Sequence, residues 1–135
     1  MTKTFKLIIR TPEAEIFNGD AQSIHVTTEG GDLQAMADHA SLTGSILCSR
    51  ITIECAEETH EFMVRRGLFT FHNHKNEATL LATHAEKLSE MKMETVKEYL
   101  KFIEEQLRAG NDLSDFQITH LEGEKLAVEQ TMAQI

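Results

Sequence analysis

The first 85 residues alternate apolar and polar side chains, the pattern of β-strands with one buried face. The alternation is clearest in four segments: Phe5–Ile9, Ile51–Cys55, Phe62–Val64 and Phe69–Phe71. Turn-forming residues lie between such segments, at Asn18-Gly19, Glu29–Asp32, Ala56–Thr59, Arg66-Gly67 and Asn73–Asn76. Short strands with turns about every ten residues are typical of a sandwich or barrel. We therefore expect residues 1–85 to form a β-sandwich domain.

Apolar residues after position 85 recur every three or four positions, which is the spacing of one face of an α-helix. The run from Leu88 to Leu107 predicts an amphipathic first helix of about 20 residues. A glycine at 110 and the capping-box pattern Ser114-x-x-Gln117 indicate a break and the start of a second helix. Its apolar stripe consists of Leu113, Phe116, Leu121, Val128, Met132 and Ile135. The short connection predicts an antiparallel helical hairpin over residues 86–135.

The apolar stripes of the two predicted helices are narrow, and two isolated helices have no core of their own. The stripes must therefore lie on the sandwich or on a partner. In the second helix, Gly123, Glu124 and Lys125 weaken or interrupt the stripe. A permanently packed hairpin and a mobile one both remain open. If the helices fold back, Val96, Ile103 and Val128 are expected to be shielded from solvent.

Composition and charge narrow the choice of partners. The 135 residues include 13 Lys and Arg against 22 Asp and Glu, a net charge of −9. This sign disfavours binding to nucleic acid or to anionic lipid head groups. Near the N-terminus the apolar run Leu7–Ile9 is far too short for a signal peptide or a membrane span. Cys48 and Cys55 lack the spacing of a metal site and are expected to be reduced, packed thiols.

His72 and His74, with Glu77 close behind them, are the strongest candidates for chemistry. Two histidines at i and i+2 point to the same side of a strand, and one carboxylate completes a facial ligand set for Fe(II), Mn(II) or Zn(II). The set is similar to the metal motif of cupin barrels, with His84 as a further ligand. However, Asn73–Asn76 resembles a hairpin turn, which favours solvated histidines instead. A small cupin-like metal-dependent enzyme is therefore the alternative hypothesis.

Other catalytic patterns are missing from the sequence. It contains neither the phosphate-binding GxxxxGK[ST] loop nor the GxSxG turn that carries a nucleophilic serine. His39 has only Asp38 beside it as an acidic neighbour, so we expect a hydrogen-bonding structural histidine rather than a catalyst. Hydrolysis by an activated nucleophile is thus unsupported, and solvated turn histidines without a metal remain the main interpretation of His72 and His74.

One longer segment carries a family resemblance. Gly31-x-Leu33-x-x-Met36-x-x-His39-Ala40-x-Leu42 resembles the segment G-x-L-G-I-L-P-G-H-A-P-L of epsilon subunits of F-type ATP synthases, the delta/epsilon family. Further matching pieces occur in the family's order at Leu7–Glu13, Ile16–Gly19, Ile24–Val26, Gly67–Phe71, Ala78–Ala82 and His84–Glu86. The resemblance spans essentially the whole chain, and its collinearity is more specific than any single piece. Ala37 and Ser41 replace two prolines of the family segment, so this loop is expected to be less rigid.

The resemblance implies a fold and a role. The fold would be α+β, with an antiparallel sandwich of about ten strands followed by the hairpin, as in that family. The role would be that of a non-catalytic rotor subunit on the cytoplasmic face of the bacterial inner (plasma) membrane, attached to the membrane only through the complex. The sandwich would dock on the gamma subunit and meet the ring of c subunits. By position, the ring-facing residues are Thr28, Glu29, Gly30, Gly31, Asp32, Asp38, His39 and Ala40.

The resemblance also implies a regulatory hairpin, which either folds onto the sandwich or extends to the alpha/beta head and blocks ATP hydrolysis. Its residues here are Leu88, Lys92, Val96, Ile103 and Val128. Family members that bind ATP there carry I/L-D-x-x-R-A, of which residues 88–93 keep only the leucine and a positive charge. Lysine and arginine are not equivalent phosphate binders, so binding of ATP by the hairpin, and with it any cofactor, is not expected. An adaptor that has left the synthase is a third hypothesis.

Overall fold

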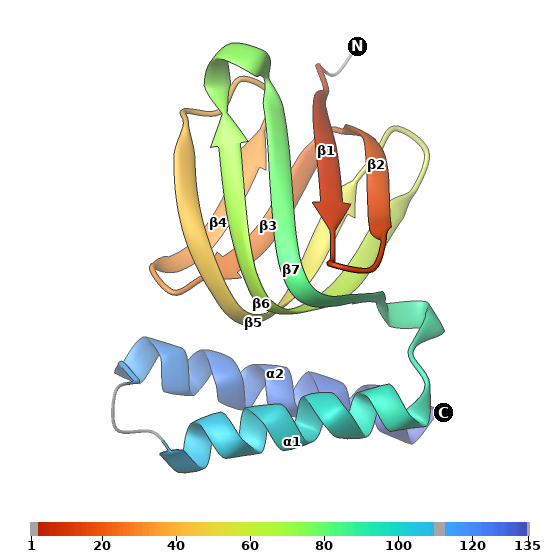
Figure 1. The fold of residues 1–135 in the computed structure, drawn as a ribbon, viewed down its shortest axis with the longest axis vertical. Helices are drawn as coiled ribbons and strands as arrows, with labels where there is room; N and C mark the ends of the chain where they lie inside the picture. Colours follow the sequence, from red (N-terminus) through yellow and green to blue (C-terminus); the bar gives the residue numbers. More distant parts are fainter. Residues whose placement is uncertain (1–2, 110–112, 135) are drawn as a thin grey trace. The chain divides into compact units, whose positions relative to one another are not determined.

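The computed structural model describes residues 3–109 and 113–134, with side chains in the last helix described as far as residue 129. The chain divides into two compact units, Met1–Leu88 and Ser89–Ile135. Within the described residues, the first unit is one seven-stranded sheet that curls into a sandwich-like body (Figure 1). Its strands are β1 Phe5–Arg10, β2 Glu15–Ala21, β3 Ser23–Thr28, β4 Gly31–Met36, β5 Leu42–Glu54, β6 Thr59–His72 and β7 Glu77–Lys87.

The strand order across the sheet is β2-β1-β7-β6-β5-β3-β4. All neighbouring strands run antiparallel except β1 and β7, which pair in parallel with Leu7 opposite Ala78 and Ile9 opposite Leu80. The expectation of a purely antiparallel sandwich is therefore wrong, and the sheet is mixed. Parallel neighbours need a long connection between them, and here the intervening strands β2 to β6 supply it.

The expected count of about ten strands is also wrong, because two turn signals lie inside strands. Gly19 pairs with Leu7 within β2. Arg66 has a φ of 53°, and the pairing of β6 skips it on both sides while Gly67 pairs with Ile46 and Ala82. The register is the same before and after Arg66, because Arg65 pairs with Cys48 and His84, so the unusual backbone at Arg66 does not reverse the strand. As a result β6 continues through Arg66 as a single strand of 14 residues.

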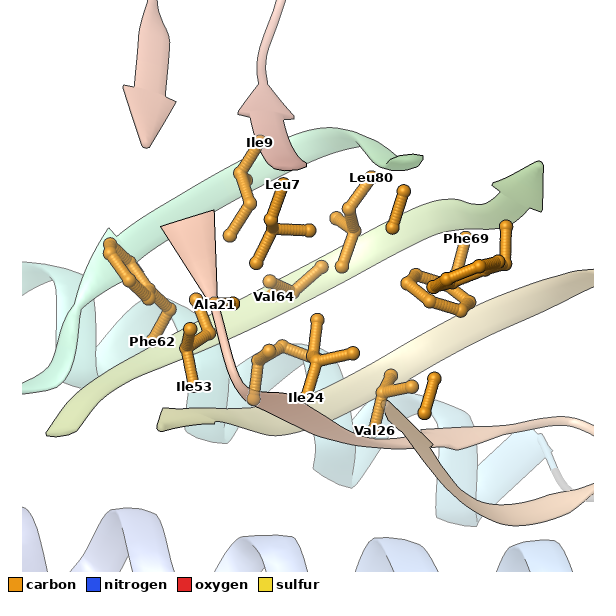
Figure 2. Close-up of a cluster of buried hydrophobic side chains, with 14 of the residues drawn as sticks. Leu7, Ile9, Ala21, Ile24, Val26, Ile53, Phe62, Val64, Phe69 and Leu80 are labelled. Carbon is orange, nitrogen blue, oxygen red and sulfur yellow. The ribbon is translucent and has the colours of Figure 1, made fainter. Parts of the chain in front are cut away.

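The core of the first unit lies between the folded-over parts of the sheet. Phe5, Leu7 and Ile9 of β1 are buried, whereas Lys6 and Arg10 between them are exposed, which confirms the alternation. Figure 2 shows side chains from β1, β3, β6 and β7 converging on the same interior. Each buried aliphatic side chain contributes about 1.5–3 kcal/mol through the removal of apolar area from water. The alternating pattern therefore decides which face of each strand turns inward.

The second unit contains the helices α1 Met93–Ala109 and α2 Asp115–Gln134, preceded by the single-turn 3₁₀ helix η2 Leu88–Glu90. The predicted start of the first helix was too early. β7 continues beyond residue 85 because His84 to Lys87 pair with Arg65 to Phe62 of β6, and sheet pairing overrides the helical spacing there. Neither described helix has the length and apolar character needed to cross a bilayer.

The predicted capping box at the start of α2 is confirmed. The Ser114 N–H donates to Gln117 Oε1 at 3.0 Å, and the Gln117 N–H donates to Ser114 Oγ at 3.2 Å. Two backbone donors that the helix leaves without partners are thereby satisfied. The predicted break at residue 110 lies outside the described residues.

The two helices pack on each other and run in opposite directions (Figure 1). Lys125 Nζ of α2 lies 3.7 Å from Glu104 Oε1 of α1. The predicted α2 stripe is only partly correct: Leu121 and Val128 are buried, but Phe116 is exposed and Glu124 is buried. The side chains of residues 132 and 135, also assigned to the stripe, lie outside the description.

Candidate functional site

The β3–β4 turn contains the first group of predicted site residues. Thr28 Oγ1 donates to the Gly31 carbonyl at 3.1 Å and accepts a hydrogen bond from the Gly30 N–H at 3.2 Å. Gly31 has a φ of 133°, a conformation that residues with a side chain rarely adopt. At the foot of the turn, Thr27 Oγ1 donates to Asp32 Oδ1 at 2.6 Å. The turn predicted at Glu29–Asp32 is confirmed, and its own side chains hold it closed.

The same turn is held against β5. The Glu29 N–H donates to the Ser45 carbonyl at 2.8 Å. A Cβ atom at Gly44 would lie 2.8 Å from Thr28 Cγ2, so only glycine fits at position 44 without a shift. Gly44 was not singled out from the sequence, although a glycine inside a strand often marks the close approach of another chain segment.

The β4–β5 loop contains the second group, Asp38, His39 and Ala40. The His39 N–H donates to the Met36 carbonyl at 3.1 Å, and Asp38 has a φ of 65°. Because Ala37 is not among the residues with positive φ, these features identify a type II turn over Met36–His39. Such a turn prefers proline at its second position and glycine at its third. This chain has alanine and aspartate there.

Side chains from the β6–β7 connection bind this loop. Asn73 Nδ2 donates to the carbonyls of Asp38 at 2.8 Å and His39 at 2.9 Å, and the Asn73 N–H donates to Ser41 Oγ at 2.9 Å. The Asp38 N–H donates to Asn76 Oδ1 at 2.6 Å. These residues are more than thirty positions apart, so no local signal in the sequence predicted the contact.

The two groups of predicted site residues lie at opposite ends of β4, about 17 Å apart along the strand. Both border the beginning of β5: Glu29 bonds to Ser45, and the His39 ring lies edge-on to Phe71, whose cross-strand partner is Leu42. The structure therefore does not join them into one loop, but it places both beside the same stretch of β5. Glu29 and Asp38 are exposed in these loops, and Asp32 is exposed at the start of β4.

The alternative metal site receives no support. His72 ends β6, His74 belongs to the single-turn 3₁₀ helix η1 Asn73–Lys75, and Glu77 begins β7. The predicted turn at Asn73–Asn76 is thus confirmed, and the two rings lie 6.4 Å apart at 80° instead of sharing a strand face. His84 lies seven residues along β7, opposite Arg65. Throughout residues 3–109 and 113–129, no three His, Cys, Asp or Glu side chains are arranged to hold a metal ion.

The predicted hairpin residues occupy different environments. Leu88 belongs to η2, and Lys92 directly precedes α1, where its carbonyl accepts a hydrogen bond from the Val96 N–H at 3.0 Å. Val96, Ile103 and Val128 are buried. Residues 88–93 therefore do not form the continuous opening of α1 that their helical spacing predicted.

An apolar pair is exposed on the outer face of the sheet, a feature that sequence reasoning missed. Leu68 of β6 is 42% exposed and its direct cross-strand partner Leu81 of β7 is 50% exposed. Beside Leu81 lies a shallow groove of about 360 Å³, lined by Arg10, Thr11, Pro12, Leu81, Ala82 and Thr83. Contiguous exposed apolar side chains with a polar rim are typical of protein-binding surfaces.

Comparisons with known proteins agree on one family. Residues 4–88 match the family model described as "ATP synthase, Delta/Epsilon chain, beta-sandwich domain". The ATP synthase epsilon chain of Clostridium botulinum (strain Alaska E43 / Type E3) is 30% identical over 112 residues, which are 82% of each chain. The "ATP synthase epsilon chain, sodium ion specific" of Propionigenium modestum is 27% identical over 86% of this chain and 83% of its own length.

Solved structures share the fold. A chain in the Euglena gracilis mitochondrial ATP synthase (OSCP/F1/c-ring) has a TM-score of 0.66 at 13% identity, covering 94% of this chain and 81% of that chain. A chain in the central stalk/c-ring structure of the Tetrahymena thermophila mitochondrial ATP synthase has a TM-score of 0.58 at 15% identity, covering 98% and 97%. Both the sheet and the helices are therefore included in the structural match.

Proposed function

This chain belongs to the ATP synthase delta/epsilon chain family, and from that membership we propose that it is a non-catalytic rotor subunit in the central stalk of an F-type ATP synthase. Its role is to couple the gamma subunit to the ring of c subunits. The observation that carries the proposal is the match of the family's β-sandwich to residues 4–88, combined with epsilon-chain relatives aligned over 82% of the chain.

The geometry supports a mechanical role. A part that transmits torque has to keep its shape under load, and the curled sheet is close-packed around one apolar core. The β3–β4 and β4–β5 loops are each tied to neighbouring backbone, so a force applied to them passes into the sheet. We propose that these loops face the c-ring, where exposed Glu29, Asp32 and Asp38 meet polar or basic loops.

The gamma subunit requires a different surface. The exposed pair Leu68 and Leu81 offers apolar area on the outer face of β6 and β7. Burial of apolar side chains at the centre of an interface is a larger source of affinity than rim charges. We propose this pair as part of the surface that docks on gamma.

The proposed location follows from the proposed assembly. The subunit lies on the cytoplasmic face of the bacterial inner (plasma) membrane and is attached to it only through the complex. One relative is named as sodium ion specific, so the coupling ion has to be measured and not assumed.

Reconstitution tests the proposal. The purified chain is added to its own epsilon-depleted synthase in vesicles, and ATP-driven pumping is followed separately with proton-sensitive and sodium-sensitive dyes. We expect co-purification with gamma and restored pumping. Binding to other proteins without binding to gamma would favour the free-standing adaptor. Stoichiometric transition metal in the purified chain would revive the enzyme hypothesis.

We further propose that the hairpin inhibits ATP hydrolysis weakly or not at all. An extended hairpin needs basic residues to meet acidic partners in the head. From Asp115 to Gln134 the chain has one lysine, Lys125, against Asp115, Glu122, Glu124 and Glu129, and Lys125 already lies beside Glu104. Truncation after Leu88 is therefore expected to leave ATP hydrolysis by the reconstituted enzyme within twofold of the full chain. A large rise in hydrolysis on truncation would contradict the proposal.

A further inference from the structure

The local sequence of the β4–β5 loop does not favour the turn that it forms. A type II turn over Met36–His39 would be stabilised by proline at 37 and glycine at 38. Ala37 leaves the second position flexible, and Asp38 adopts a φ of 65°, which aspartate tolerates better than most residues with a side chain but less readily than glycine. The loop's own residues therefore fix the turn less firmly than proline and glycine would, which gives contacts from outside the loop a larger part in its order.

The β6–β7 connection supplies four hydrogen bonds to this loop. Asn73 contributes three of them, two from its side-chain amide and one from its backbone N–H. Asn76 accepts the fourth from the Asp38 N–H. In Figure 1 the two connections lie at the same end of the sheet.

Asn76 also ties the loop to the start of the chain. Its Nδ2 donates to the Thr4 carbonyl at 2.8 Å, while its Oδ1 accepts from Asp38. A carboxylate could accept but not donate, and an alkyl side chain could do neither, so the amide is the group that suits both partners. Asn76 itself has a φ of 49°, which asparagine tolerates better than most residues.

The ion pair between Lys3 and Asp38 cannot replace these bonds. Lys3 Nζ lies 2.5 Å from Asp38 Oδ2, but the two side chains are 69% and 50% exposed. Exposed ion pairs contribute little, because water and salt screen them. The hydrogen bonds that hold the loop from outside therefore come mainly from the side-chain amides of Asn73 and Asn76, beside the edge-on contact of the His39 ring with Phe71.

We infer that Asn73 and Asn76 are positioning residues that clamp the β4–β5 loop in one conformation, in place of the proline and glycine that the turn would otherwise need. The clamp follows from the hydrogen bonds alone. Its mechanical consequence rests on the proposed function: a force on Asp38–Ala40 passes through Asn73 into the connection between β6 and β7, two neighbouring strands of the sheet.

Hydrogen–deuterium exchange of the full chain tests the clamp. The variants are N73A and N76G, because glycine retains the left-handed backbone of residue 76 while removing its amide. The control is N18A, which removes an exposed asparagine whose side chain donates to Glu15, three residues away on the same strand. We expect at least tenfold faster exchange at the amides of Asp38 and His39 in both clamp variants, with Ile24 and Ile53 of the core unchanged. Unchanged exchange at 38 and 39, or equal acceleration throughout the sheet, would overturn the inference.

A rescue variant sharpens the test. A37P places proline at the second position of the type II turn, where its fixed φ is already suitable. Added to N73A, it is expected to restore most of the lost protection at His39. Failure to restore it would show that Asn73 acts otherwise than by holding this turn.

A measurement of ion pumping distinguishes a failure of the clamp from a failure of the proposed function. In the reconstituted synthase, N73A is expected to lower the number of ions pumped per ATP hydrolysed, and A37P to recover it. If exchange changes as expected but pumping does not, the clamp stands and the ring-facing role of the loop fails. If exchange does not change, the clamp fails whatever pumping shows.

Discussion

Individual residues of this protein are constrained by contacts that cross between strands. Gly44 is the clearest case. Substitution G44A would place a Cβ atom 2.8 Å from Thr28 Cγ2, which forces the β3–β4 turn away from β5. We expect G44A to lower the free energy of unfolding by about 1–3 kcal/mol, the usual cost of overpacking, as measured by denaturant titration.

The matched control for G44A is G30A. Its Cβ atom would lie 3.7 Å from Thr28 Oγ1, an ordinary contact. Its effect is expected to stay within about 0.5 kcal/mol. Equal losses in the free energy of unfolding of the two variants would show that the backbone freedom of glycine matters at these positions and that the steric contact with Thr28 does not.

The Cys55 thiol gives a prediction about pH. Burial raises its pKa above the ordinary value, and the nearby carboxylates of Glu58 and Asp20 raise it further. Because only the thiolate is nucleophilic, Cys55 is expected to react with iodoacetamide more slowly than an unfolded cysteine at pH 8, with the difference shrinking as pH rises. The raised pKa also means that Cys55 favours folding at neutral pH and that this contribution is lost in strongly alkaline solution. Equal rates at pH 8 would contradict the prediction.

At the scale of elements, two substitutions in and next to α2 are expected to change the stability of the helix in opposite directions. S114A removes one half of the capping box and is expected to destabilise the helix by about 0.5–2 kcal/mol. G123A introduces a methyl group that meets nothing within 4 Å, so it is expected to stabilise the helix by about 1 kcal/mol. Circular dichroism during thermal unfolding measures both. Stabilisation by S114A, or destabilisation by G123A, would show that helix propensity does not govern this unit.

Elements also show where reading the sequence succeeded and where it failed. Alternation identified the buried face of β1, and the Ser114-Gln117 pair identified the start of α2, because both depend on neighbours in the sequence. Arg66-Gly67 was misread as a turn. The dipeptide indicates an unusual backbone conformation, but whether the chain then reverses or continues as a strand depends on the pairing partners on both sides of β6.

At the scale of the whole molecule, the proposed assembly predicts a hot spot on the sheet. Each of L68D and L81D places a charge in the exposed apolar pair, so either change is expected to weaken binding to gamma at least tenfold without unfolding the chain. Isothermal titration with purified gamma measures the affinity. The control is M36D, which adds the same charge at an exposed apolar residue on β4. This strand forms an edge of the sheet, and β5 and β3 separate it from β6. If M36D weakens binding as much as L81D, net charge and not this surface sets the affinity.

The sequence by itself determined the class of the protein: alternating residues and then a helical period produce a sheet followed by two helices, and the collinear segments identify the family. Tertiary structure alone decided the parallel pairing of β1 with β7, the continuation of β6 through Arg66, the need for glycine at 44 and the bonds from Asn73 and Asn76. The physical reason is how far apart in the sequence the interacting residues lie. Periodicity, capping and turn preferences act between residues a few positions apart. The contacts that decided these features join residues fifteen or more positions apart, and more than seventy apart between β1 and β7, so they form only once the chain has folded.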